Sequence, residues 1–141
     1  MKIKFIIEYK GTHFHGWQIQ KNARTVQGEL NNAFKILLPH YNINIIGSGR
    51  TDAGVHASNQ IASIQLPKDI NLNKFFNSIN GIIDNDIHVK SYEEVDKDFH
   101  ARFSAKYRSY KYYINTEYSP FKKNVSWFVN SKINLILLNE C

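Results

Sequence analysis

The 141 residues have the length of one ordinary domain, and with 43% hydrophobic and 21% charged residues the chain can bury a core and fold as a soluble globule. No apolar run approaches the length that spans a bilayer, and the first residues lack the apolar stretch and cleavage site of a signal peptide. We therefore expect a cytoplasmic protein with no membrane partner. Cys141 is the single cysteine, which excludes an intrachain disulfide and a thiolate metal cluster.

The positive charge of the chain is unevenly distributed. The formal net charge is +6, and residues 99–132 carry seven Lys and Arg against Glu117 alone, together with ten aromatic residues. Basic side chains attract phosphates and aromatic rings stack on exposed bases, so this combination indicates RNA. A strand with one solvated lysine face and one buried aromatic face explains the same composition. Charge alone favours this second interpretation.

The chain begins with a segment rich in β-formers. Lys4–Tyr9 predicts a strand, and the polar, glycine-containing stretch 10–24 predicts a loop. Thr25 can cap a helix that Pro39 ends. The apolar stripe of this helix comprises Val26, Leu30, Ala33, Phe34, Leu37 and Leu38.

Two more strands frame a glycine-rich stretch. Asn42–Ile46 predicts a second strand and residues 47–54 predict a loop. Gln60–Leu66 predicts a third strand, because its apolar residues alternate and so share one face. These residues are Ala62, Ile64 and Leu66.

The next segments predict a helix and two strands. Asp69 or Asn71 can cap the helix, whose apolar residues are Leu72, Phe75, Phe76, Ile79, Ile82 and Ile83. Residues 86–95 predict a fourth strand. Lys106–Thr116 predicts a fifth, long strand with alternating tyrosines.

This order of elements, β-α-β-β-α-β plus one long strand, predicts an α+β fold. It is the ferredoxin-like or RRM-like split βαβ arrangement, a mainly antiparallel sheet with two helices on one face. The other face is left bare, as an RNA platform or as a surface that awaits a second domain. We expect one domain over residues 1–141.

The last residues predict the start of a further helix. Ile133, Ile136, Leu137 and Cys141 have helical spacing, and Asn130 or Ser131 can cap them. The chain stops after barely two turns, and isolated helices of this length are marginal. We therefore expect a chain truncated inside a helix that begins near residue 131.

The stretch 47–57, GSGRTDAGVHA, is the most informative part of the sequence. Its glycines let the backbone turn tightly and approach a bulky ligand. Among them lies one carboxylate, Asp52, with Arg50 two residues before it. A nearby guanidinium favours the charged form of a carboxylate, which suits a nucleophile or a base better than a general acid. By spacing alone, an ordinary turn aspartate is the favoured interpretation.

Four motifs along the chain bear on the role of Asp52. They are YKG at 9–11 with GWQIQ at 16–20, TVQGEL at 25–30, GRTDAGVHA at 49–57, and DFHARFSA at 98–105 with RSYKY at 108–112. In this order they resemble the motifs of the TruA family of tRNA pseudouridine synthases, and the resemblance favours a functional aspartate over a turn residue. Lys10 departs from the family's usual Asp, and we expect no catalytic consequence.

The resemblance implies a site and a reaction. Asp52 matches the family's catalytic aspartate, Arg50 an arginine implicated in extruding the target nucleotide, and Tyr110 the tyrosine that stacks on the flipped uracil. Uridine and pseudouridine are isomers, so no cofactor and no metal is expected. The implied partner is the anticodon stem-loop of tRNA, at nucleotides 38, 39 and 40. His56 and Trp17 stay open, the former between a backbone contact and a role in the site, the latter between a core anchor and an RNA contact.

The resemblance also implies what surrounds this unit. Family members are about twice as long and resemble two fused copies of it, and the second half supplies a basic partner for the aspartate and much of a homodimer interface. This chain matches the N-terminal half. The alternatives are a catalytically inactive RNA-binding fragment of the same family and an unrelated RRM-like module, which the lack of RNP motifs disfavours.

Overall fold

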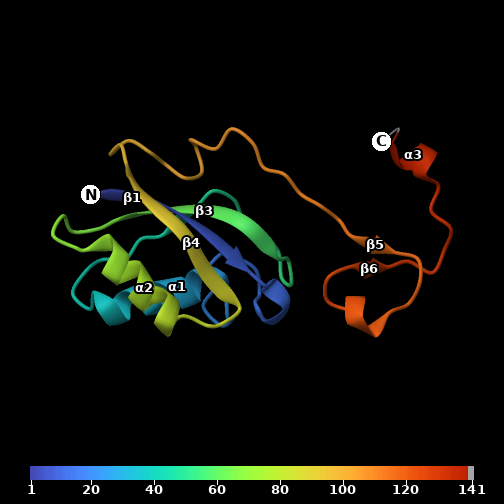
Figure 1. Ribbon diagram of the computed structural model, residues 1–141, viewed down its shortest axis with the longest axis horizontal. Helices are drawn as coiled ribbons and strands as arrows, with labels where there is room; N and C mark the ends of the chain where they lie inside the picture. Colours follow the sequence, from blue (N-terminus) through green and yellow to red (C-terminus); the bar gives the residue numbers. More distant parts are fainter. Residues whose placement is uncertain (140–141) are drawn as a thin grey trace. The chain divides into compact units, whose positions relative to one another are not determined.

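The computed structural model describes residues 1–139, and the chain divides into two compact units, Met1–Tyr107 and a second that starts at Arg108. The first unit holds a four-stranded sheet with two helices on one of its faces (Figure 1). Its elements in chain order are β1 (Lys2–Tyr9), the 3₁₀ turn η1 (Gly11–His13), α1 (Val26–Leu37), β2 (Ile46–Gly47), β3 (Ala57–Gln65), α2 (Leu72–Ile82) and β4 (Ile87–Val95).

The strand order β2-β3-β1-β4 confirms the predicted split βαβ fold. Every neighbouring pair in the sheet is antiparallel. The central strands β1 and β3 pair from Lys2↔Gln65 to Tyr9↔Ala57, with one irregularity near the end of β1. The loop between β2 and β3, which contains Arg50 and Asp52, therefore enters β3 beside the C-terminal end of β1.

Side-chain caps start both helices of this unit. Thr25 Oγ1 accepts a hydrogen bond from the Gly28 amide at 3.2 Å, and α1 ends two residues before Pro39. At α2, Asn71 and not Asp69 is the cap, since its Oδ1 accepts from the Lys74 amide at 3.0 Å. Both helices match the predicted starts, although Ile82 of the predicted apolar stripe is 39% exposed.

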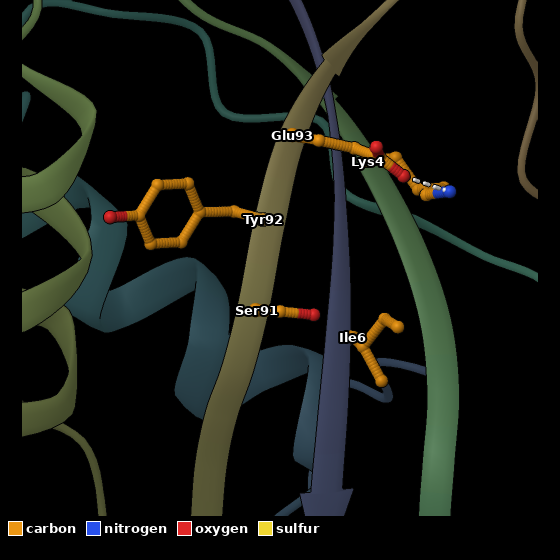
Figure 2. Close-up of a pocket in the computed structure, with 5 residues that line it drawn as sticks. All are labelled: Lys4, Ile6, Ser91, Tyr92 and Glu93. Carbon is orange, nitrogen blue, oxygen red and sulfur yellow. Dashed lines mark ion pairs between the residues drawn. The ribbon is translucent and has the colours of Figure 1, made fainter.

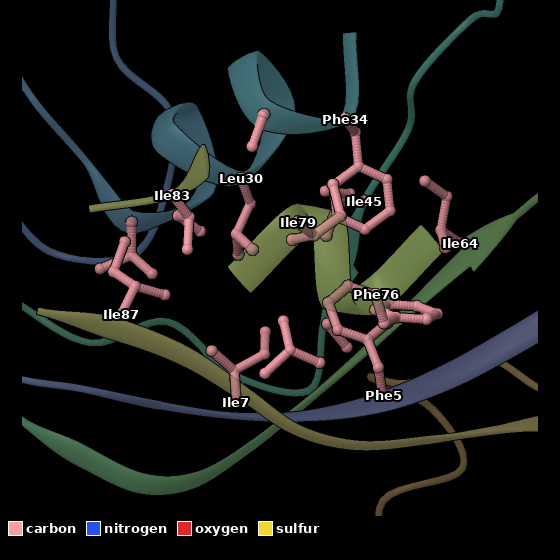
Figure 3. Close-up of a cluster of buried hydrophobic side chains, with 14 of the residues drawn as sticks. Phe5, Ile7, Leu30, Phe34, Ile45, Ile64, Phe76, Ile79, Ile83 and Ile87 are labelled. Carbon is pink, nitrogen blue, oxygen red and sulfur yellow. The ribbon is translucent and has the colours of Figure 1, made fainter. Parts of the chain in front are cut away.

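The core fills the space between the sheet and the helices (Figure 3). Alternate residues of β1 are buried, beginning with Ile3 and Phe5. The Phe5 ring lies 5.8 Å from that of Phe34 in α1 and 5.7 Å from that of Phe76 in α2. Burial of such rings is the main stabilising term of a small domain, so this aromatic cluster joins both helices to the central strand.

The opposite face of the sheet carries polar and charged side chains. Lys4 of β1 pairs with Glu93 of β4 (Figure 2), and Lys90 Nζ lies 3.4 Å from a Glu8 carboxylate oxygen. Tyr92 points the other way and stacks on Phe76 with ring centroids 4.4 Å apart. Alternate residues of the strands thus face the helices, and the other face is left bare of helices, as predicted.

The strand predicted over Asn42–Ile46 is wrong except at its last residue. Only Ile46 and Gly47 pair with β3. Ile43 and Ile45 are buried in the core, but the Ile45 carbonyl accepts from the side-chain amide of Gln27 at 2.8 Å. A side chain therefore takes the place of a strand partner at this carbonyl.

The long strand predicted over Lys106–Thr116 is also wrong. Of the residues 106–116, only Ile114–Asn115 (β5) forms a strand, which pairs in parallel with Trp127–Phe128 (β6). Tyr107, Tyr110 and Tyr112 are exposed. A preference for strands reflects packing on a neighbouring strand more than an intrinsic backbone tendency, and these residues of the described structure have no such neighbour.

The second unit also contains the 3₁₀ turn η2 (Pro120–Lys122) and a short helix α3 (Leu135–Asn139). The helix begins later than predicted, because Asn134 Oδ1 accepts from the Ile136 amide at 3.0 Å and so provides the cap. Cys141 lies outside the described residues. Within residues 1–139, no helix has both the length and the apolar character needed to cross a membrane.

The aromatic cluster predicts the outcome of one pair of substitutions in α1. Phe34→Ala removes a fully buried ring and should lower the free energy of unfolding by about 3–5 kcal/mol. Ile36→Ala, at a position on the same helix that is 64% exposed, should change it by less than about 0.5 kcal/mol. Urea unfolding followed by circular dichroism measures both. Equal losses would show that α1 does not pack as described.

Candidate active site

Asp52 and Arg50 lie on the loop that joins β2 to β3, and both side chains are exposed. The Val55 amide donates to the Asp52 carbonyl at 3.2 Å and closes a turn, in which Gly54 has φ +80°. This left-handed conformation suits glycine. The carboxylate of Asp52 is therefore presented to solvent at the start of a tight turn.

Thr51, the residue between Arg50 and Asp52, is held from two sides. Its carbonyl accepts from the Trp17 amide at 3.0 Å, and its hydroxyl lies 2.8 Å from the Tyr9 hydroxyl. Tyr9 is the last residue of β1, and Trp17 is 1% exposed. Of the two interpretations left open for Trp17, the structure supports the core anchor, and the Trp17 backbone fixes the residue beside the carboxylate.

Two more hydrogen bonds hold the far side of the turn. The Gly54 amide donates to the Phe14 carbonyl at 3.1 Å. His56 Nδ1 accepts from the Gly11 amide at 2.8 Å. That bond needs an unprotonated Nδ1, so the imidazole acts here as an acceptor for loop backbone. The backbone of Asp52 is therefore fixed on both sides, as a catalytic side chain requires.

The supporting segment 11–17 is itself tied to the helices by Arg24. The Arg24 guanidinium donates to Asp84 at 2.7 Å and to Glu29 at 2.8 Å, and lies 4.8 Å above the Phe14 ring. Its backbone carbonyl accepts from the His15 amide at 2.8 Å. Arg24 therefore links the end of α2, the first turn of α1 and the loop beneath Asp52.

The ion pairs of Arg24 shift the pKa of their partner. The hydrogen bond from Arg24 lowers the pKa of Asp84 below its ordinary value, and the Asp86 amide adds to this. The pKa of Arg24 is raised in turn, chiefly by its bond to Glu29 and then by that to Asp84. A carboxyl with a lowered folded pKa stabilises the fold fully above its unfolded pKa, and this contribution is lost as the pH falls through the folded pKa. Since the side chains of Arg24 and Asp84 are partly exposed, this contribution to the free energy of unfolding is small.

The structure brings two of the three predicted site residues onto one loop. Tyr110 belongs to the second unit, where 62% of its surface is exposed. Sequence reasoning missed Tyr9 and Thr51 as supports of the site, although both lie within the quoted motifs. Among residues 1–139, no group of three or more His, Cys, Asp or Glu is placed to hold a metal ion.

Two glycines with the same backbone conformation provide a matched test of the support. Gly16 has φ +81° and Gly54 has φ +80°, but a Cβ on Gly16 would collide with the Thr51 carbonyl whereas one on Gly54 would meet open space. Gly54→Ala should cost about 1–2 kcal/mol for the left-handed backbone alone. Gly16→Ala should cost about 1–3 kcal/mol more, because the loop must also move.

Urea unfolding of both variants measures this difference. Equal losses of stability in the two variants would mean that Gly16 does not lie against the Thr51 carbonyl as described.

Comparison with known proteins shows the family to which the chain is similar. Residues 5–104 match the family model described as tRNA pseudouridine synthase. The chain is 40% identical over 139 residues to tRNA pseudouridine synthase A 1 of Protochlamydia amoebophila, covering 97% of this chain and 54% of that protein. It is 43% identical over 136 residues to tRNA pseudouridine synthase A of Ruminiclostridium cellulolyticum, covering 95% and 55%.

A third relative, tRNA pseudouridine synthase A of Brachyspira hyodysenteriae, is 42% identical over 142 residues, which cover 98% of this chain and 57% of that protein. The chain thus spans about half the length of the curated relatives it matches. On this evidence, the chain belongs to the tRNA pseudouridine synthase family and corresponds to part of a TruA protein.

Proposed function

We propose that this chain provides the aspartate-bearing half of an enzyme that isomerises uridine to pseudouridine in tRNA. One observation carries the proposal: Asp52 is exposed on a turn whose backbone is fixed at Thr51 and Gly54. A carboxylate needed only for a local turn requires no such support from a distant segment. The names of the relatives support tRNA as the substrate.

The reaction suits a single carboxylate. The N1–C1′ bond of uridine breaks, the base rotates, and C5 bonds to C1′. The C5 hydrogen is released as a proton, and N1 takes up a proton in its place. Substrate and product are isomers, so the balance needs no oxidant, reductant or second substrate. Asp52 either adds to the nucleoside or removes a proton from the sugar, and both routes need the carboxylate close to the extruded nucleotide.

We assign the steps around the chemistry to Arg50 and Tyr110. A base inside a stem must leave its stack, which costs a few kcal/mol. Arg50, two residues before Asp52, is exposed and suited to fill the space that the base leaves. Tyr110 is suited to stack on the uracil, and stacking of a base on an aromatic ring contributes about 1–3 kcal/mol.

The basic, aromatic stretch 99–132 supports RNA binding. Seven bases against Glu117 provide phosphate contacts, and most of the aromatic rings there are exposed. We propose the anticodon stem-loop as the target, at nucleotides 38, 39 and 40, and a cytoplasmic homodimer as the complete enzyme. The second candidate function, an RNA-binding fragment without activity, is favoured by the half-length match to the relatives.

The isolated chain tests whether this half is sufficient for catalysis. We expect the 141-residue chain to bind tRNA weakly and in a salt-sensitive manner, and to release no tritium from tRNA labelled with [5-³H]uridine. A site open on one side does not exclude water or preorganise charge around Asp52. Robust release by the purified chain would show instead that this half is sufficient for catalysis.

Asp52→Asn should abolish turnover in the complete enzyme, with a fall in kcat of about 10⁴-fold or more. The affinity for tRNA should stay within about threefold, because phosphate contacts carry most of it. Tritium release and filter binding measure the two quantities.

Asp69→Asn is the matched control, since it removes another exposed carboxylate outside the loop and should leave both quantities unchanged. Near-normal turnover by Asp52→Asn would reduce Asp52 to a turn residue.

For Tyr110, the ring and not the hydroxyl should matter. Tyr110→Phe should retain most of the single-turnover rate, whereas Tyr110→Ala should lose about 10- to 100-fold, which corresponds to about 1–3 kcal/mol of stacking. Rapid-quench measurement of both variants decides between the two roles. An inactive Phe variant would point to proton transfer by the hydroxyl.

A further inference from the structure

Gln60 of β3 makes an unusual pair of contacts with the site loop. Its side chain is 9% exposed, its Nε2 donates to the Gly49 carbonyl at 2.7 Å, and its Oε1 accepts from the Ser48 hydroxyl at 3.1 Å. A carbonyl only accepts, so the NH₂ group must face Gly49. This amide therefore holds two successive residues immediately before Arg50.

These contacts begin where the β-ladder ends. β2 pairs with β3 at Ile46↔Ser63 and Gly47↔Ala62, and the Ser48 amide then donates to the Ile61 carbonyl at 2.7 Å. In the described structure this is the last backbone bond between the two segments. Gln60, one residue further along β3, continues the connection with its side chain. The Gln60 side chain thus holds the backbone carbonyl of Gly49, directly before Arg50.

Arg50 consequently lies between two independent anchors. Gly49 is held by Gln60, whereas Thr51 is held by the Trp17 amide and the Tyr9 hydroxyl. Loss of the first anchor leaves the second in place. The backbone at Arg50 then gains freedom, while that at Asp52 keeps its supports.

We propose that Gln60 is a positioning residue for Arg50, which acts by fixing the Gly49 carbonyl and not by contact with RNA. The functional part of this proposal rests on the proposed function, in which Arg50 fills the place of the extruded nucleotide. Gln60 should thus govern how efficiently the nucleotide is extruded, with little effect on the affinity for tRNA.

The competing interpretation is that Gln60 is a buried amide whose hydrogen bonds only stabilise the fold. Gln60→Glu distinguishes the two interpretations, because it keeps the shape and the acceptor for Ser48 but loses the donor to Gly49. Ser48→Ala is the matched control, since it removes the other contact and leaves the Gly49 anchor intact. Ile79→Val, on the buried face of α2, controls for a general loss of stability.

The first measurement is ¹⁵N relaxation of the 141-residue chain, which reports backbone order at each amide. In Gln60→Glu the order parameters of Gly49 and Arg50 should fall, while those of Gly54 and His56 stay as in the parent chain. Ser48→Ala and Ile79→Val should leave Arg50 ordered. An unchanged Arg50 in Gln60→Glu would overturn the proposal.

A pH series tests whether the lost donor is the cause. A buried carboxyl protonates more readily than an exposed one, and the protonated form again has a donor for the Gly49 carbonyl. Lowering the pH from about 8 to about 5.5 should therefore restore order at Arg50 in Gln60→Glu relative to the parent chain. Disorder that persists at low pH would assign the effect to altered packing and contradict the proposed hydrogen bond.

The second measurement is turnover by the complete enzyme. Gln60→Glu should lower kcat by about 10- to 100-fold, the effect of a small misplacement of a positioning group, with KM and the Kd for tRNA nearly unchanged. A normal kcat together with a loosened Arg50 would contradict the role in extrusion. If the parent enzyme released no tritium, the proposed function would fail, and the relaxation data would still decide whether Gln60 positions Arg50.

Discussion

The contact between two loops distant in sequence is the constraint on which the site depends. The segment 9–17 and the loop 48–56 are joined through Thr51, Gly54 and His56, and these bonds lie on both sides of Asp52. Each of these bonds joins a backbone amide or a hydroxyl to a hydrogen-bond acceptor. A buried polar group without a hydrogen-bond partner would lower the stability of the fold. The site is therefore specified by hydrogen bonds between loops, while the sheet and helices supply the rigid base to which the loops are attached.

The sheet and helices hold the loop that carries Asp52 in a fixed position relative to the core. Tyr9 extends the central strand directly into the site, and Trp17 buries its ring beneath the loop. Arg24 adds a bridge between both helices and the segment under Asp52. These contacts fix the backbone that carries Asp52, while its carboxylate stays exposed to solvent. By contrast, the second unit exposes most of its aromatic residues, as expected of a surface that meets RNA or further protein.

The sequence was sufficient for the elements whose signals are local. Thr25 and Asn71 start helices through their own side chains, the β-formers of Lys4–Tyr9 predict the first strand, and the alternation in Gln60–Leu66 predicts its buried face. It failed where a distant partner decides the structure, as at Ile45, whose carbonyl accepts from Gln27, and over residues 106–112, which form no strand in the described structure. Spacing alone would have left Asp52 a turn residue, and only the family motifs singled it out. The support from Gln60 has no local signal, because a single glutamine in a strand has no periodicity.

The central claim is that Asp52 converts uridine to pseudouridine in the anticodon stem-loop of tRNA. The most direct measurement is mapping of pseudouridine in tRNA from cells that lack this gene, with complementation by the parent gene and by the Asp52→Asn variant. The account predicts that modification at nucleotides 38, 39 and 40 disappears, returns with the parent gene and does not return with the variant. Unchanged modification at these nucleotides in the cells without the gene would contradict it.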